Sequence, residues 1–124
     1  DIMLVQINPI NIPKTPKTPE EIRDRINELS FNSSLMLEMR RVSFVDRLIE
    51  MGINPDGLFK KIRIHNINPE EDMWDWNLSS KLNATWGFLT ELKELGRKYA
   101  EDWLNKNYEH IGVKATCDIR STFL

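Results

Sequence analysis

The apolar run at the start of the sequence constrains this chain more than any other feature. Residues 2–5 read Ile-Met-Leu-Val, and Ile7 continues the run after a single Gln. A short apolar run without alternation is typical of a strand covered on both faces, as in a parallel sheet. We therefore expect a strand over residues 1–8, whose sheet neighbours come from other parts of a longer polypeptide.

Only one other strand is expected. Residues 61–67 alternate polar and apolar side chains, the pattern of a half-exposed strand. Two strands alone make a marginal sheet, so the edge formed by residues 1–7 should stay partly open in the isolated chain. An open apolar edge favours pairing with another chain, and we expect self-association through residues 1–7. The alternative is an extended N-terminal strand on an independent helical domain.

A proline-rich connector and the first of two long helices are expected between the two strands. Residues 9–18 form a proline-rich connector. A helix should begin at Pro19, with Thr18 as its N-cap and Glu21 completing a capping box, and should run to Met51 before Gly52. Weak helix formers at residues 32–34 predict a bend or break within it.

The final helix is expected over residues 80–107 and to be the longest element, with Ser79 and Ser80 as capping residues. Its inward face should carry apolar and aromatic side chains at helical spacing, Trp86 and Trp103 among them. The stripe consists of Leu82, Trp86, Phe88, Leu89, Leu92, Leu95, Tyr99 and Trp103.

Charge and composition exclude several classes of protein. The net charge is -2, with basic and acidic residues interleaved, so the sequence predicts no nucleic-acid partner. The longest aliphatic run is far shorter than the ~20 residues of a membrane-spanning helix. The single cysteine, Cys117, rules out an internal disulfide.

The residues that carry chemistry are scattered, and the sequence predicts no catalytic, cofactor-binding or metal-binding residue. None of the five glycines brackets a serine as a nucleophile elbow requires. Cys117 has only His110 near it in sequence, and His65 is expected to be a hydrogen-bonded structural residue. Asp56-Gly57 is expected to be a turn, and the acidic run at residues 70–72 a solvated turn with one helical turn begun near Pro69.

Two tryptophans remain as candidates for contact with a lipid. Trp74 and Trp76 flank Asp75 in an expected loop, where their rings can touch an acyl chain or a membrane interface. Burial of both rings under the final helix is the alternative.

Three stretches resemble a known family: residues 1–10 (DIMLVQINPI), 28–49 (ELSFNSSLMLEMRRVSFVDRLI) and 79–104 (SSKLNATWGFLTELKELGRKYAEDWL). They are similar to the C-terminal third of bacterial patatin-like phospholipases, in the same order and with similar spacing. The resemblance covers nearly the whole chain. In that family a GxSxG serine and a DG(G/A) aspartate act as a catalytic pair on an α/β core, upstream of the segment that matches residues 1–9. Neither motif is present here.

The resemblance implies that residues 1–124 are a single C-terminal segment of an α/β parent fold, mostly helical with two short strands. The chain alone would be inactive, and its partner would be the catalytic core of the same polypeptide. That parent would hydrolyse lipid acyl esters without a metal or cofactor. We expect a cytoplasmic location in a bacterium, with secretion to a host as the alternative. An independent helical interaction module is the competing hypothesis for function.

Overall fold

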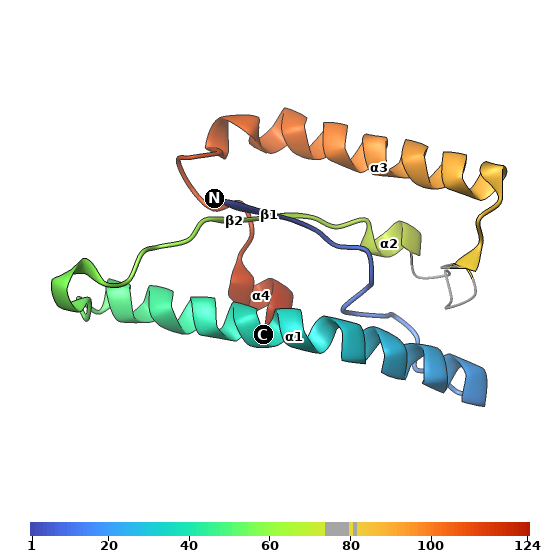
Figure 1. Ribbon diagram of the computed structural model, residues 1–124, viewed down its shortest axis with the longest axis horizontal. Coiled ribbons are helices and arrows are strands. Elements are labelled where there is room, and N and C mark those ends of the chain that lie inside the picture. Colours follow the sequence, from blue (N-terminus) through green and yellow to red (C-terminus); the bar gives the residue numbers. More distant parts are fainter. Residues whose placement is uncertain (74–79, 81) are drawn as a thin grey trace.

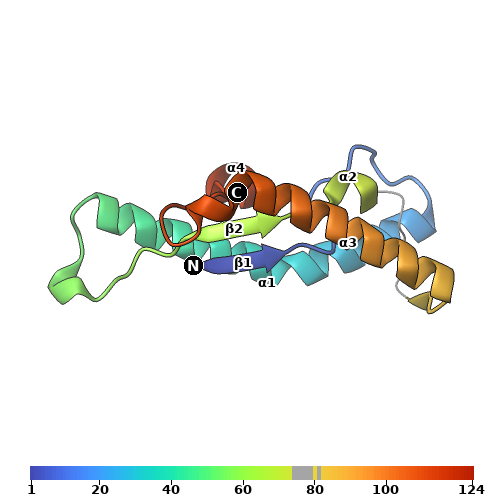
Figure 2. The ribbon, with the colours of Figure 1, turned by 90° about the horizontal axis from the view of Figure 1, so that it is seen from above.

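The computed structural model describes residues 1–73, 80 and 82–124. Two short strands lie between two long helices, with a short C-terminal helix packed beside the first (Figures 1 and 2). The described elements in chain order are β1 (Ile2–Val5), α1 (Pro19–Glu50), a 3-10 turn (Pro55–Gly57), β2 (Ile64–Ile67), α2 (Glu70–Met73), α3 (Trp86–Asn107), a 3-10 turn (Tyr108–His110) and α4 (Ile119–Phe123). The chain is therefore mainly helical with two short strands, as expected.

The two strands are parallel, and α1 is the crossover between them. Ile2 pairs with Ile64 and Val5 with Ile67. The backbone N–H of Ile2 donates to the carbonyl oxygen of Arg63, just before β2, and that of Gln6 donates to the carbonyl oxygen of Ile67. Because successive residues of a parallel strand direct their backbone groups to opposite sides, those of Met3 and Val5 point to the other edge of β1. Among the described strands, β2 is the only partner of β1.

The side chains of β1 are largely exposed in this chain. Ile2, Met3, Val5 and Ile7 are between 40% and 64% exposed. Leu4 differs, because it packs against the core cluster. The backbone edge and most side chains of β1 are therefore partly open in this chain, as was expected for residues 1–7 without further sheet neighbours.

The core lies where β2, α1 and α4 meet. It is built around Ile10, Met39, Ile64, Ile119 and Phe123. Ile64 and His65 are adjacent in β2 and nearly fully buried, at 0% and 1% exposed. The sequence predicted a half-exposed strand over 61–67. That is wrong at this pair, because α1 and α4 cover one face of β2 and α3 covers the other (Figure 1).

Helix α1 begins as its sequence predicts. The Thr18 hydroxyl accepts a hydrogen bond from the Glu21 N–H at 3.2 Å, and the Glu21 carboxylate accepts from the Thr18 N–H at 3.0 Å. The backbone N–H groups of Lys17, the largest cause, and of Thr18 donate to the Glu21 carboxylate and lower its pKa. At the other end, Gly52 has a φ of 76°, which suits a glycine directly after a helix.

The expected break in α1 is wrong, because the helix runs unbroken from Pro19 to Glu50. Asn32, a weak helix former, is 3% exposed and donates its side-chain amide to the Pro9 carbonyl at 3.0 Å. Arg25 donates to the carbonyl oxygens of Pro9 and Ile10. These contacts hold the start of the connector against α1 and offset the poor helix propensity at residue 32.

Thr18→Ala should lower the free energy of unfolding by about 1 kcal/mol, because the first turn of α1 loses the side-chain acceptor for the Glu21 N–H. Urea denaturation measures the change. Thr15→Ala is the matched control, since Thr15 is an exposed residue of the connector, and it should change stability by less than about 0.5 kcal/mol. Equal effects of the two substitutions would contradict the capping role.

Helix α3 begins at Trp86, not near Ser80, and α1 rather than α3 is the longest element. Thr85 is the N-cap residue, and the expected cap by Ser80 is not observed. Phe88, Leu92, Leu95 and Tyr99 are half-buried and Trp103 is buried, so this part of the predicted stripe does face inward.

Trp86, Leu82 and Leu89 are exposed, and the prediction that they complete the apolar face is wrong. Trp86 is 84% exposed because it stands at the first turn of α3, at the end far from the strands (Figure 2). No helix in the described part of the chain is both long and apolar enough to cross a bilayer.

Candidate functional site

Among the residues whose burial the structure describes, His65 of β2 is the most strongly buried titratable one, at 1% exposed. Its Nδ1 lies 2.9 Å from the Thr116 hydroxyl and its Nε2 lies 3.1 Å from the Asp1 carboxylate. The Trp103 ring of α3 meets the imidazole edge to face, with the ring centroids 5.6 Å apart. His65 thereby joins the start of β1, α3 and the segment before α4 in one contact network.

The two hydrogen bonds fit a neutral imidazole. A carboxylate only accepts, so Nε2 carries the proton toward Asp1, and Nδ1 accepts from the Thr116 hydroxyl. Burial, the largest cause, lowers the pKa of His65. The hydrogen-bonded structural role predicted for this histidine is confirmed.

A row of buried amides lies where the parallel strands end, and it was not predicted from the sequence. The Gln6 amide donates to the Asn8 carbonyl at 3.2 Å, and the Asn66 amide donates to Gln6 Oε1 at 3.2 Å. Asn32 of α1 adds its bond to Pro9. Gln6, Asn8 and Asn32 are each less than 10% exposed. The only sequence signal was an asparagine inside a helix.

An apolar groove of about 450 Å³ lies next to these amides, at the carboxyl end of the strands. In open α/β sheets this end is where ligands bind. Residues 7–9, which follow β1, form one wall, Phe31 of α1 another, and α3 a third. The apolar side chains that line it are Ile7, Pro9, Phe31, Met73, Phe88, Leu89 and Leu92. The volume falls in the ~300–1,000 Å³ range of small-molecule sites.

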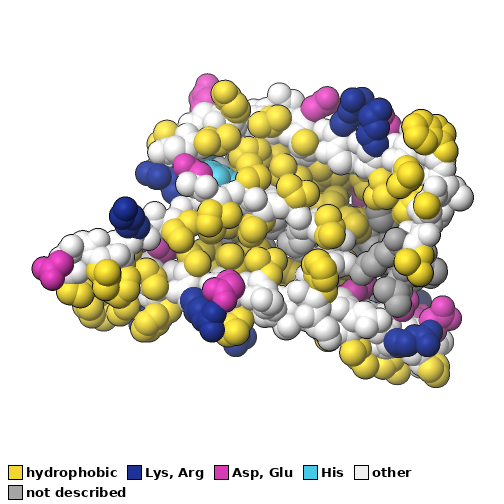
Figure 3. Space-filling model, in the orientation of Figure 1, with side chains coloured by type: hydrophobic (Ala, Val, Ile, Leu, Met, Phe, Trp, Pro, Cys, Tyr) yellow, Lys and Arg dark blue, Asp and Glu magenta, His cyan; other side chains and the backbone are white. Residues whose placement is uncertain are grey.

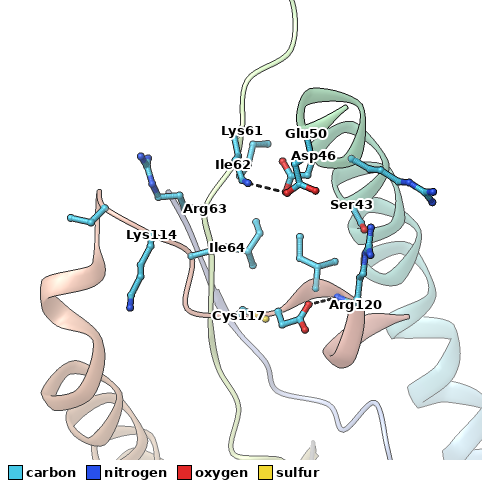
Figure 4. Close-up of a pocket in the computed structure, with 15 residues that line it drawn as sticks. Ser43, Asp46, Glu50, Lys61, Ile62, Arg63, Ile64, Lys114, Cys117 and Arg120 are labelled. Carbon is cyan, nitrogen blue, oxygen red and sulfur yellow. Dashed lines mark hydrogen bonds and ion pairs between the residues drawn. The ribbon is translucent and has the colours of Figure 1, made fainter. Parts of the chain in front are cut away.

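A second, polar cavity of about 750 Å³ lies at the opposite end of β2, between α1 and the segment before α4 (Figure 4). Lys61 and Glu50 form an ion pair of 3.2 Å, and both side chains are more than half exposed. Arg63 and Lys114 extend away from α1 in this view, so the basic side chains do not converge on one point. Burial raises the pKa of Asp46 in the same wall, while Lys61 opposes that rise.

Cys117 lines this polar cavity but is not prepared to act as a nucleophile. Its thiol donates to the Thr122 hydroxyl at 3.6 Å. Burial raises the pKa of the thiol, which disfavours the reactive thiolate. The interaction with α4 gives Cys117 a structural role beside the core.

The remaining sequence candidates fall into ordinary structural settings. Asp56 and Gly57 both have positive φ values in an exposed turn, as predicted. Asp72 of α2 accepts a hydrogen bond from the Tyr99 hydroxyl at 2.9 Å and so ties α2 to α3. The helical turn predicted after Pro69 is confirmed as α2.

Within residues 1–73, 80 and 82–124, no cluster of three or more His, Cys, Asp or Glu side chains is arranged to hold a metal ion. Trp74, Asp75, Trp76 and Ser79 lie outside the described residues. The proposed lipid contact of the two tryptophans therefore stays a prediction.

The chain matches no protein-family model, no curated protein and no solved structure.

Proposed function

We propose that this chain is the C-terminal, non-catalytic part of a patatin-like serine lipid acyl hydrolase. In this proposal the catalytic serine and aspartate lie upstream, and β1 joins the chain to the central sheet of the catalytic core. The parent would hydrolyse ester bonds of phospholipids or related acyl lipids. The groove beside Phe31 and Phe88 would then form part of the wall that faces the acyl chain.

The observation that carries the proposal is the open edge of β1. Parallel strands with helices on both faces are the building unit of α/β folds, and such sheets usually contain more than two strands. Among the described residues, β1 pairs on one side only, and its Met3 and Val5 side chains are 40% and 64% exposed. An apolar parallel strand with a free edge is suited to continue into further strands of a larger sheet.

The edge of β2 that faces away from β1 differs from the open edge of β1, because it is partly covered. The Ile64 carbonyl on that side accepts hydrogen bonds from the backbone N–H groups of Thr116 and Cys117 at 3.2 and 3.1 Å. The segment before α4 thereby covers the start of this edge. A sheet that continues beyond this chain would therefore do so through β1.

The first test is a serine-reactive fluorophosphonate probe. A longer gene product that encodes GxSxG and DG(G/A) ahead of Asp1 should be labelled at the GxSxG serine and should hydrolyse p-nitrophenyl acyl esters. Residues 1–124 alone should show neither labelling nor turnover. Labelling of a serine within residues 1–124, removed by its substitution with alanine, would contradict the proposal. So would an upstream sequence without both motifs, which would favour an independent interaction module.

The second test concerns the edge itself. Val5→Lys should change the free energy of unfolding of the isolated chain by less than about 0.5 kcal/mol, because the Val5 side chain is exposed there. In the longer protein the same substitution should lower the free energy of unfolding by about 1 kcal/mol or more, because the lysine side chain is then buried within the larger sheet. Val113→Lys is the matched control: Val113 is 68% exposed in a turn, and its substitution should be neutral in both proteins. Equal effects of Val5→Lys in both would count against continuation through β1.

A further inference from the structure

Helix α1 carries a second apolar face that no described part of the chain covers. The core side of the helix holds Asn32 and Met39, its two buried residues. At 100° per residue, a different set of apolar positions falls within an arc of about 80°, centred roughly 110° from the core side. This set, the outer stripe, consists of Ile22, Ile26, Leu29, Leu37, Phe44 and Met51.

Each side chain of the outer stripe is between 46% and 63% exposed. From Ile22 to Met51 the stripe extends over ~44 Å of helix. Figure 3 shows hydrophobic side chains along the lower margin of the molecule, where α1 lies. A long apolar surface of this kind is typical of an interaction site rather than of a free protein surface.

Charges that are interleaved along the sequence are separated around this helix. All five arginines of α1 fall within about 80° of the centre of the outer stripe, whereas all seven carboxylates lie at least about 100° from it. The arginines are Arg23, Arg25, Arg40, Arg41 and Arg47. The outer stripe is therefore the middle of a face of α1 that is both apolar and positively charged.

Three of these arginines are available to a partner. Arg25 and Arg41 pair with carboxylates of the same helix. Arg23, Arg40 and Arg47 are exposed and form no ion pair within the described part of the chain. They are spread from the first turns of α1 to its last turn, so unpaired positive charge accompanies the apolar side chains along the helix.

We propose that this face of α1 lies on an anionic lipid surface, with the helix axis parallel to the membrane plane. The outer stripe enters the boundary between the headgroups and the acyl chains, where amphipathic helices bind membrane surfaces. Arg23, Arg40 and Arg47 lay their aliphatic stems along the stripe and place their guanidinium groups at the anionic headgroups.

The positions of the charges and of the core select this partner. A second copy of the same face would oppose arginines to arginines, which is unfavourable between like charges. A nucleic acid would bind the arginines but offers no apolar phase for the stripe. A protein that wraps around a basic amphipathic helix does not fit either, because the core side of α1 with Asn32 and Met39 is packed against the rest of the chain. A flat lipid surface contacts one side of a helix over its whole length.

The carboxylates of α1 do not oppose this contact strongly. They lie on the sides of the helix turned away from the lipid, and a helix with its side chains is ~10 Å across. Salt at physiological concentration screens charges over ~8 Å. The arginines are therefore the charges that the lipid surface meets first, although the chain as a whole has a net charge of -2.

The inference is independent of the proposed function, because it concerns α1 and requires neither ester hydrolysis nor further strands beside β1. Its tests measure binding of residues 1–124 to vesicles. Flotation on a density gradient is the method, because bound protein rises with the vesicles and self-associated protein does not.

The first test concerns charge. The chain should float with vesicles of phosphatidylcholine that contain about one-third phosphatidylserine, and should bind about tenfold more weakly when NaCl is raised to about 0.5 M. Arg40→Glu should weaken binding about tenfold at low salt. Arg97→Glu is the matched control: it makes the same change of charge at an exposed position of α3, and should alter the affinity less than about threefold.

The second test concerns the apolar stripe. Phe44→Ser should weaken vesicle binding about tenfold, because the ring no longer enters the lipid. Phe31→Ser is the control, since Phe31 has the same exposure of 62% but lies on the side of α1 away from the stripe. It should alter the affinity less than about threefold, and neither substitution opens the core.

An environment-sensitive fluorophore reports the orientation of the helix. With Cys117→Ser in place, a label on Ser33→Cys, at the centre of the arc, should shift to the blue on anionic vesicles. A label on Asn27→Cys, about 120° away and also exposed, should not shift.

A chain that does not float with the anionic vesicles at low salt would overturn the proposal and favour an acidic protein as the partner of this face. Equal binding to vesicles of phosphatidylcholine alone would also overturn it. So would equal effects of Arg40→Glu and Arg97→Glu, or of the two serine substitutions, the latter because lipid would then bind at the groove beside Phe31 as well.

Discussion

Replacing Phe123 with alanine is expected to destabilise the chain by about 3–5 kcal/mol, the largest effect of any single substitution considered for this protein. Phe123 is 1% exposed and belongs to the core cluster with Met39 and Ile64. Its removal loses the burial of the ring and leaves a cavity between α4 and α1. Because a domain of this size has only ~5–15 kcal/mol of stability, a large part of the total is lost.

Urea denaturation followed by tryptophan fluorescence measures this effect. Phe31→Ala is the control, since the same side chain is removed from a position that is 62% exposed. We expect that variant to remain within about 1 kcal/mol of the parent chain. A loss below about 1 kcal/mol for Phe123→Ala would mean that α4 is not packed against α1 in solution.

Acidification from pH 7.5 to pH 5 is expected to lower the free energy of unfolding, because the folded chain holds His65 in its neutral form. Burial lowers the pKa of His65 in the folded chain, whereas in the unfolded chain it returns to about 6.5. The unfolded state therefore binds the proton more readily. The stabilisation is complete above pH 6.5 and is lost as the pH falls toward the folded pKa, with a limiting slope of ~1.4 kcal/mol per pH unit.

His65→Gln separates this contribution from the rest of the titration. The glutamine keeps an amide that can bond to Thr116 or Asp1 but does not titrate, so the stability profile between pH 5 and 6.5 should become flatter. His110→Gln, in the 3-10 turn after α3, should keep the steep profile. Profiles of equal slope for His65→Gln and the parent chain would show that His65 does not enter the folded state in its neutral form.

Local signals in the sequence predicted local structure well. The start of α1 follows from Thr18, Pro19 and Glu21, whose interactions span three residues. The inward face of α3 follows from helical spacing at Phe88, Leu92 and Trp103. Both predictions rest on chemistry that neighbouring residues complete among themselves.

The features that were predicted wrongly, or not predicted, depend on contacts between residues far apart in the sequence. The break expected at Asn32 is prevented by a bond to Pro9, 23 positions earlier in the chain. The exposure of Trp86 depends on where the strands end relative to α3. The spacing of apolar residues along the helix does not reveal that position. The partners of His65 lie 51 and 64 positions away. The buried amides and both cavities are assembled in the same way, so the sequence pattern alone did not reveal them.

The parallel pairing of β1 and β2 also has a consequence for how the chain folds. Because Ile2 pairs with Ile64, the first strand contact closes a loop of about 60 residues, at an entropic cost of ~4 kcal/mol. Helix α1, by contrast, is started by contacts within one turn. We expect α1 to form early and the strands to pair late, so substitutions in β1 should mainly accelerate unfolding and leave the folding rate nearly unchanged.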